Sequence, residues 1–179
     1  MPDSNIATSG LFGVMKLANF HEDLALESRF YRVVKKHYNE KGCDCVFLHY
    51  NGGKSMLEAM QRKHDIDVIV DDGIKNTTLS LKATRKPYPS IFFETISNCT
   101  TGTHGWGLDS EADEVCYGMQ VDGNWFLLFF KLQQLRDIYR RYPAYRSCTK
   151  NNKGEVLYET EGHPIPLSAF KKRIVKIEQ

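Results

Sequence analysis

The sequence predicts one domain of the α/β (α+β) class, in which a mixed central β-sheet is flanked by helices. Three patterns lead to this prediction: an amphipathic segment at 19–41, three β-rich runs within 64–96, and an apolar run at 125–130. With 179 residues, 41% hydrophobic and 26% charged, the chain has the size and composition of a single globular domain. We expect a core at about 20–135 and a basic C-terminal extension at about 136–179.

The first predicted element is a helix at 19–41, because apolar residues recur there with helical spacing and Gly42 supplies a stop. Residues 45–50 are apolar and aromatic and precede an Asn-Gly-Gly turn, so they are expected to form a short buried strand. A helical turn or two at 55–63 then leads into the β-rich centre of the chain.

The centre of the chain reads as three strands at Ile66–Val70, Thr77–Lys82 and Ser90–Ile96. Alternation places Asp65 and Asp67 on one face of the first strand and Ser80 and Lys82 on one face of the second. A turn centred near residues 73–75 would put Asp67 opposite Ser80 and Asp65 opposite Lys82. That register buries both apolar faces together and gathers the polar groups on the other side.

The rest of the chain continues this mixture of helices and strands. The patterns predict, in order, a loop at 98–107, a helix from Asp109 or Ser110 to Met119, a hairpin at 121–124, a buried strand at 125–130, a helix at 131–142, strand-like pieces at 156–158 and 163–167, and a final amphipathic segment from Ser168. Trp106 lies in the glycine-rich loop, where its ring would either stack on a base or anchor the core; we favour the core.

A carboxylate and an ammonium group on one sheet face suit cleavage of a phosphodiester with the help of a hard cation. Carboxylates bind such cations, and a lysine stabilises developing negative charge or orients the attacking water. The alternative is that these are ordinary solvated residues of an edge strand, which charged side chains usually are.

The spacing of these residues resembles the active site of the PD-(D/E)XK nuclease superfamily. Asp67 matches the first acid, and Ser80-Leu81-Lys82 matches the element that ends in the lysine. Ser80 departs from the usual acid, but some restriction enzymes of the superfamily have Ser-x-Lys with the glutamate displaced about a dozen residues downstream. Glu94 follows Lys82 by twelve residues and resembles that displaced acid. The runs around Lys82 and Glu94 also look like nuclease-like proteins of phages.

The resemblance implies a restriction-endonuclease-like αβββαβ core and a magnesium-dependent deoxyribonuclease, with manganese as a substitute metal. Asp67 and Glu94 would bind the metal and Lys82 would assist catalysis, with Ser80, Asp65 and Glu27 as further candidates. Glu27 would reach the site from the first helix; pairing with Arg29 or Tyr31 on the helix flank is the equally supported alternative.

DNA is the partner that the resemblance implies, and the concentration of basic residues towards the end of the chain suits binding to a phosphate backbone. Residues 131–179 carry 11 Lys and Arg against 5 Asp and Glu, and the preceding residues carry 13 against 17. Such a region suits contacts with phosphates, although a solvated helix face has the same composition. The candidate phosphate-binding residues are Arg85, Lys86, Arg136, Arg140 and Arg141.

No apolar run reaches the length of a membrane span and the N-terminus lacks a secretory pattern, so we expect a cytoplasmic protein without membrane contact. The five cysteines have no zinc-type spacing and are expected to be reduced. The sequence leaves open exonuclease or endonuclease action, DNA or RNA as substrate, and the oligomeric state, a homodimer included. Two other functions stay open: a nuclease-like binding module without catalysis, and an interaction protein with an exposed acidic hairpin.

Overall fold

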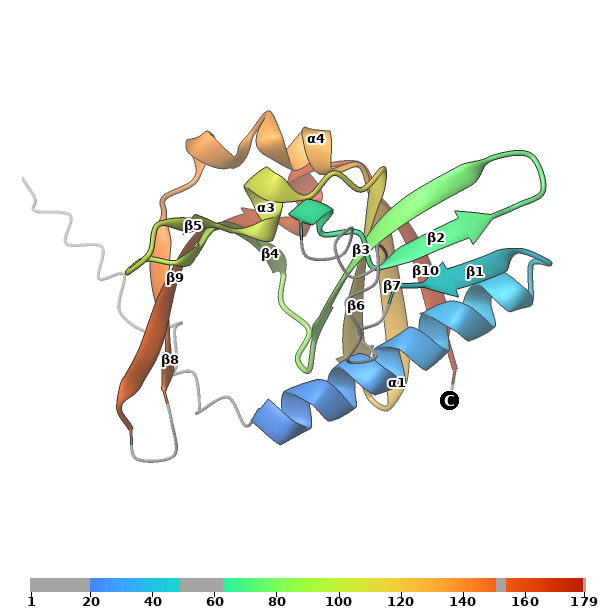
Figure 1. Cartoon of the computed structure of the whole chain (residues 1–179), viewed down its shortest axis with the longest axis horizontal. Helices are drawn as coiled ribbons and strands as arrows, with labels where there is room; N and C mark the ends of the chain where they lie inside the picture. The colour runs from blue at the N-terminus through green and yellow to red at the C-terminus, as the bar shows by residue number, and fades with distance from the viewer. Residues whose placement is uncertain (1–19, 49–62, 151–153, 179) are drawn as a thin grey trace, which may run out of the picture.

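The computed structural model describes residues 20–48, 63–150 and 154–178 (Figure 1). The coarse prediction of a mixed α and β fold is confirmed, and strands predominate. In chain order the elements are α1 (Phe20–Asn39), β1 (Asp44–Phe47), β2 (Val68–Asp71), β3 (Asn76–Thr84), β4 (Ser90–Asn98), β5 (Thr103–His104), α3 (Trp106–Asp109), β6 (Glu114–Val121), β7 (Asn124–Phe130), α4 (Leu132–Arg136), η1 (Tyr139–Arg141), β8 (Tyr145–Lys150), β9 (Val156–Pro166), η2 (Leu167–Ala169) and β10 (Arg173–Ile177).

The strands form two sheets. The central sheet has six strands in the order β1-β2-β3-β6-β7-β10, and the second has four in the order β5-β4-β9-β8. Neighbouring strands are antiparallel except β3 and β6, which are parallel. A parallel pair needs a long crossover, and here the chain passes through β4, β5 and α3 between β3 and β6.

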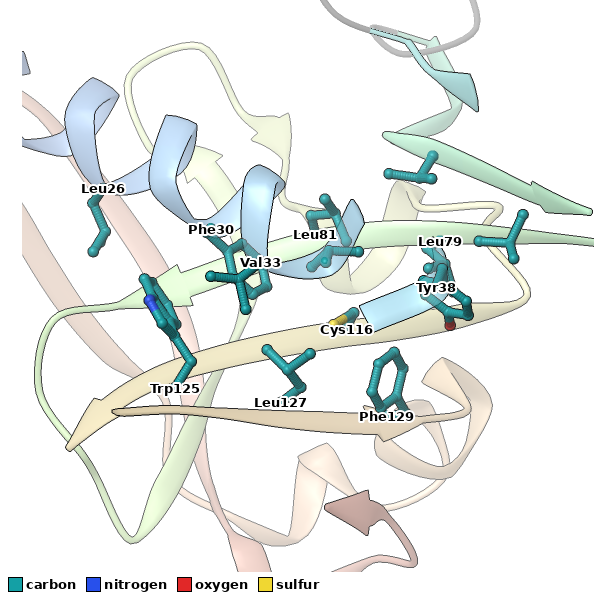
Figure 2. Packing of buried hydrophobic residues seen from close by; sticks show 13 residues of the cluster. Leu26, Phe30, Val33, Tyr38, Leu79, Leu81, Cys116, Trp125, Leu127 and Phe129 are labelled. Atoms are coloured by element: carbon teal, nitrogen blue, oxygen red, sulfur yellow. The ribbon is translucent and has the colours of Figure 1, made fainter. Parts of the chain in front are cut away.

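Helix α1 covers one face of the central sheet, and the second sheet lies towards the other face (Figure 1). On the first face, Phe30 and Val33 of α1 pack with Leu81, Trp125 and other strand residues (Figure 2). On the second face, residues of β6 and β7 pack with Ile91 and Phe93 of β4 and with α4. The period-two alternation of β6 and β7 supplies both cores at once, since successive side chains point to opposite faces.

Two sequence predictions agree closely with the structure. The expected helix at 19–41 is α1, and Gly42 has a φ of 72°, the left-handed conformation that ends a helix. The expected strand at 125–130 lies within β7, and these residues are buried on both faces apart from the partly exposed Phe126. The helical turns expected at 55–63 cannot be compared in the same way, because residues 49–62 lie outside the described residues.

The helix predicted from Asp109 or Ser110 to Met119 is wrong, because most of that segment forms strand β6. The acids at its start resemble those of a helix N-terminus, but Asp113 forms hydrogen bonds with strand β3 instead. Asp113 Oδ2 accepts hydrogen bonds from the Thr78 amide at 2.8 Å and from the Thr78 hydroxyl at 2.9 Å. These bonds fix the start of β6 beside β3, where the buried alternation of β6 completes the central sheet.

Other predicted elements differ in extent or type. Helix α4 is shorter than the expected 131–142 and is followed by the 3-10 turn η1. The pieces expected at 156–158 and 163–167 are one strand, β9, because it pairs along its length with β4 and β8. The final amphipathic segment, from Ser168, contains the end of η2 and strand β10. Within the described residues, no helix combines the length and the apolar character that crossing a bilayer requires.

Gly118 of β6 leaves the space that the Phe30 ring of α1 fills. A Cβ at this position would stand 2.3 Å from a ring carbon of Phe30, far inside van der Waals contact. We predict that Gly118→Ala lowers the free energy of unfolding by about 1–3 kcal/mol through overpacking, measured by urea denaturation.

Phe30→Leu is the matched background for this test, because it removes the ring that the new methyl group would meet. The cost of Gly118→Ala should shrink in that background, since directly contacting residues are energetically coupled. An equal cost in both backgrounds would contradict the packing described.

His37 is buried on α1 in its neutral form. Its side chain is 5% exposed and stacks on Phe129 at 5.7 Å between ring centroids, and its Nε2 has no hydrogen-bond partner among the described residues. Burial, with the nearby charges of Lys41 and Arg173, lowers the pKa of His37 from 6.5 to about 4, although Glu40 opposes the shift. The protonated ring is therefore disfavoured in the folded state.

We predict that this histidine makes the fold less stable in mild acid. Because the folded pKa lies below the unfolded one, the unfolded chain takes up a proton between pH 6.5 and 4 that the native chain refuses. Stability should fall across that window as the pH drops, by up to about 3 kcal/mol. His37→Phe, followed by thermal melts at several pH values, should flatten this dependence. Identical pH profiles for wild type and His37→Phe would refute the assignment.

Candidate active site

The site is built around Asp65, which lies just before β2. Asp65 has a φ of 49°, a left-handed conformation that non-glycine residues seldom adopt and that aspartate tolerates better than most. Its backbone carbonyl accepts a hydrogen bond from Ser110 Oγ at 3.3 Å, and the preceding carbonyl of His64 accepts one from the Glu111 amide at 2.8 Å. These contacts hold the turn that directs the Asp65 carboxylate towards β3.

Lys82 and Ser80 of β3 both donate to this carboxylate. Lys82 Nζ lies 2.7 Å from Asp65 Oδ1, and Ser80 Oγ lies 2.6 Å from Asp65 Oδ2. Ser80 is fully buried, whereas the Lys82 and Asp65 side chains keep 22% and 26% of their surface exposed. The ion pair is therefore partly desolvated but still reachable from solvent.

The β2–β3 register is the one that the sequence predicts. Val68 faces Leu79, and the same register continued by one and three residues puts Asp67 opposite Ser80 and Asp65 opposite Lys82. The sequence did not indicate the left-handed turn at Asp65, which sends the two aspartates to different kinds of partner.

Asp67 is buried, at 7% exposure, and its carboxylate binds the backbone of β3. Asp67 Oδ2 accepts a hydrogen bond from the Leu81 amide at 2.6 Å. Strand β2 pairs with β3 only as far as Leu79, so the Asp67 carboxylate takes the place of the next strand acceptor. The acid that binds Lys82 directly is thus Asp65, although the resemblance assigns the first acid to Asp67.

Glu94 approaches the same cluster from β4, a strand of the second sheet. Its strand does not pair with β3, the strand of Lys82, because β4 pairs with β5 and β9. Burial raises the pKa of Glu94, and the nearby Asp65 charge raises it further. The Lys82 charge and a hydrogen bond from the Trp106 amide act in the opposite direction without cancelling the effect of burial. A partly buried carboxylate therefore lies within electrostatic reach of both Lys82 and Asp65.

The segment around α3 closes the site on another side. A Cβ on Gly105 would stand 2.6 Å from Glu94 Cγ, so only glycine lets this segment approach β4 so closely. The Trp106 ring lies 5.9 Å from Lys82 Nζ and packs edge-on against Phe93 at 5.7 Å. Trp106 is half-buried against the second core, in line with the anchoring role favoured from the sequence, and it also borders the ammonium group of Lys82.

Arg136 holds this segment in place rather than facing outwards. Its Nε donates to the Gly107 carbonyl at 2.9 Å, and its NH2 group donates to the carbonyls of Leu108 at 2.8 Å and Ser110 at 2.7 Å. Because these donors are already engaged with the backbone, the structure gives Arg136 a structural role in place of the predicted phosphate contact. Through Ser110, the arginine also supports the backbone at Asp65.

The other predicted residues lie at the surface. Glu27 is exposed and accepts a hydrogen bond from the Tyr31 hydroxyl at 2.6 Å, which is the alternative pairing that the sequence left open. Arg85 and Lys86 are exposed in the loop after β3. Arg140 stacks on the Tyr139 ring at 5.5 Å and Arg141 is exposed. The structure thus gathers Asp65, Ser80, Lys82 and Glu94 and leaves these four basic residues outside the cluster.

The side chains of the site are of the type that binds a hard cation, but they are too few to complete its coordination. Asp65 and Glu94 offer carboxylate oxygens, the ligands that magnesium prefers, and their mutual repulsion would be relieved by a cation between them. Within the described ranges, however, no three His, Cys, Asp or Glu side chains are grouped closely enough to form a complete metal site. Backbone oxygens, substrate phosphates and water supply the remaining ligands in many magnesium sites.

We predict that the pKa of Glu94 responds to the charges of Lys82 and Asp65. Lys82→Met removes the charge that lowers the Glu94 pKa, so that pKa should rise, whereas Asp65→Asn removes a charge that raises it, so that pKa should fall. Carboxyl ¹³C NMR of the glutamate side chains across a pH titration measures both shifts. Replacing the remote Lys176 by Met is the control and should leave Glu94 unchanged. Insensitivity of Glu94 to both site variants would mean that the groups do not share a site.

Comparisons with known proteins do not assign the chain to a family. No family model matches the chain, no curated protein matches it, and no solved structure matches it. The geometry of the Asp65, Ser80, Lys82 and Glu94 cluster is therefore the basis for a functional interpretation.

Proposed function

We propose that this protein is a metal-dependent nuclease of PD-(D/E)XK type that hydrolyses phosphodiester bonds of DNA. The observation that carries the proposal is the convergence of one ammonium group and two carboxylates from three separate segments. Lys82 comes from β3, Asp65 from the turn before β2, and Glu94 from β4. Charges of this kind are costly to desolvate together, so a partly buried cluster of them is a common mark of a functional site.

The order and direction of the strands support the proposal. Helix α1 precedes the antiparallel run β1-β2-β3, and β6 joins β3 in parallel, which agrees with the αβββαβ core that the resemblance implies. The acid precedes the second strand and the Ser-x-Lys element lies on the third. In this chain the crossover between the parallel strands contains β4 and β5 besides the short helix α3, and this insertion is what brings Glu94 to the site.

Each residue has a role that follows from its position. Asp65 and Glu94, with Asp67 behind them, would hold a magnesium or manganese ion, which when bound activates water and offsets charge on the phosphate. Lys82 carries a positive charge beside both carboxylates and would stabilise the negative charge that develops on the phosphate oxygens. Glu94 must be deprotonated to bind a cation, so its raised pKa places a lower pH limit on metal binding.

The assignment is tested with purified protein on linear and circular DNA, with and without magnesium. The site variants are Lys82→Ala, Asp65→Asn, Asp67→Asn and Glu94→Gln, and the control is Asp122→Asn, an exposed acid in the turn between β6 and β7. We predict that each site variant loses at least about 100-fold in magnesium-dependent cleavage rate and that the control does not. Folding is checked by circular dichroism. Full cleavage by Lys82→Ala or by Glu94→Gln would overturn the proposal.

A catalytically inactive nuclease-like binding module is the second candidate function. The observation in its favour is Ser80, which stands where an acid is usual, is fully buried and already donates to Asp65. This module would bind DNA in a salt-dependent manner, cleave none, and gain no thermal stability from magnesium or manganese. The wild-type protein in the same assay distinguishes the two functions.

A further inference from the structure

The outer surface of α1 carries two shallow grooves. One lies between α1 and β1 and is lined by Ser28, Tyr31, Arg32, Lys35 and Phe47. The other lies between α1 and β10 and includes Arg29, Arg32 and Lys36. Arg32 borders both grooves. The two grooves therefore form one continuous surface on both sides of the helix, and we name it the α1 surface.

The α1 surface is positively charged. Its four basic residues recur at helical spacing and are all exposed: Arg29, Arg32, Lys35 and Lys36. Lys36 lies 3.9 Å from the exposed Glu40, a weak pair. Among the described residues that line the grooves the acid is Glu178, which pairs with Lys176 at 2.7 Å. Within the described part of the chain, Arg32 and Lys35 have neither a hydrogen bond nor an ion pair from their side chains. Two charges on this surface thus have no counter-charge among the residues that the structure describes.

Tyr31 belongs to the α1 surface and is also affected by the charges of Asp67 and Asp65. Its ring lines the groove beside β1 and meets Phe47 edge-on at 5.8 Å. Its hydroxyl donates to Glu27 at 2.6 Å. Burial first, and then the Asp67 charge, the Glu27 hydrogen bond and charge, and the Asp65 charge, raise the pKa of Tyr31. The same side chain therefore borders the groove and lies within electrostatic reach of both aspartates.

We propose that the α1 surface binds the phosphodiester backbone of the nucleic-acid strand whose neighbouring bond is presented to the Lys82 cluster. This inference rests on the proposed function, because it assumes that the strand reaches that cluster. Arg32 and Lys35 supply the charge, and Tyr31 and Phe47 form the apolar side of the groove between them and the site.

The dimensions of the helix are compatible with several phosphate contacts. Arg29 and Lys36 are seven residues apart in the sequence, which corresponds to about 10 Å along a helix. Consecutive phosphates of one strand advance by about 3.4 Å along a duplex, so the α1 surface spans about three of them. Neutralising each phosphate releases a counterion, so the contribution of Arg32 and Lys35 can be read from the dependence of binding on salt.

The experiment compares the full-length protein with the double variant Arg32→Gln/Lys35→Gln, which keeps long polar side chains and removes two charges. The control is Arg146→Gln/Lys171→Gln, which removes the same charge from β8 and from the segment after η2, where both residues are exposed. Binding of a fluorescently labelled DNA duplex, and of one of its single strands, is followed by anisotropy in EDTA over a range of salt concentrations.

We predict that Arg32→Gln/Lys35→Gln raises the Kd at least about tenfold and reduces the slope of log K against log salt by about 2, whereas the control changes neither appreciably. Unchanged binding of both probes by this variant, or an equal loss in the control, would overturn the inference. The outcome is independent of cleavage. Charge-dependent binding by an inactive wild-type protein would leave the α1 surface supported and the nuclease proposal refuted. Cleavage by the wild-type protein, with DNA binding that does not depend on Arg32 and Lys35, would support the nuclease proposal and refute the role of the α1 surface.

Discussion

The ion pair between Asp65 and Lys82 is the interaction on which the rest of the site depends. It needs the β2–β3 register, because a shift by one residue would turn Lys82 to the opposite face. It also needs the left-handed turn at Asp65, which the backbone contacts to Ser110 and Glu111 maintain. A partly buried pair of this kind gains little net stability, since desolvation offsets the attraction. Its position next to a third charged group, Glu94, is the basis of the proposed function.

The site lies where the two sheets meet, and this location explains its electrostatics. The packing of β4 against β6 and β7 brings Glu94 towards Lys82 and removes part of its hydration. Gly105 allows α3 to lie directly over Glu94, and Trp106 adds an aromatic ring beside the ammonium group. Arg136 ties that segment to α4 through three carbonyl groups. The surroundings of the cluster are thus fixed by hydrogen bonds and packing, as preorganised charge stabilisation requires.

Helix α1 has two different faces. Its inner face supplies Phe30 and Val33 to the larger core, where Gly118 makes room for the Phe30 ring (Figure 2). Its outer face carries Arg32 and Lys35, which have no counter-charge among the described residues. Amphipathic packing requires only that the outer face be polar. The concentration of positive charge there, beside Tyr31, is the observation behind the proposed contact with a polyanionic substrate.

The sequence by itself determined the features that depend on local periodicity. Helix α1, strand β7 and the pairing of Asp65 with Lys82 follow from apolar spacing and a turn near Gly73, because these patterns act over a few residues. Only the tertiary structure decided that β4 joins a second sheet, that Asp113 starts a strand through Thr78, and that Arg136 binds backbone carbonyls. These outcomes depend on which buried faces meet across the fold. Ile91 and Phe93 of β4 pack against residues of β6, β7 and α4, and no local sequence pattern predicts that packing.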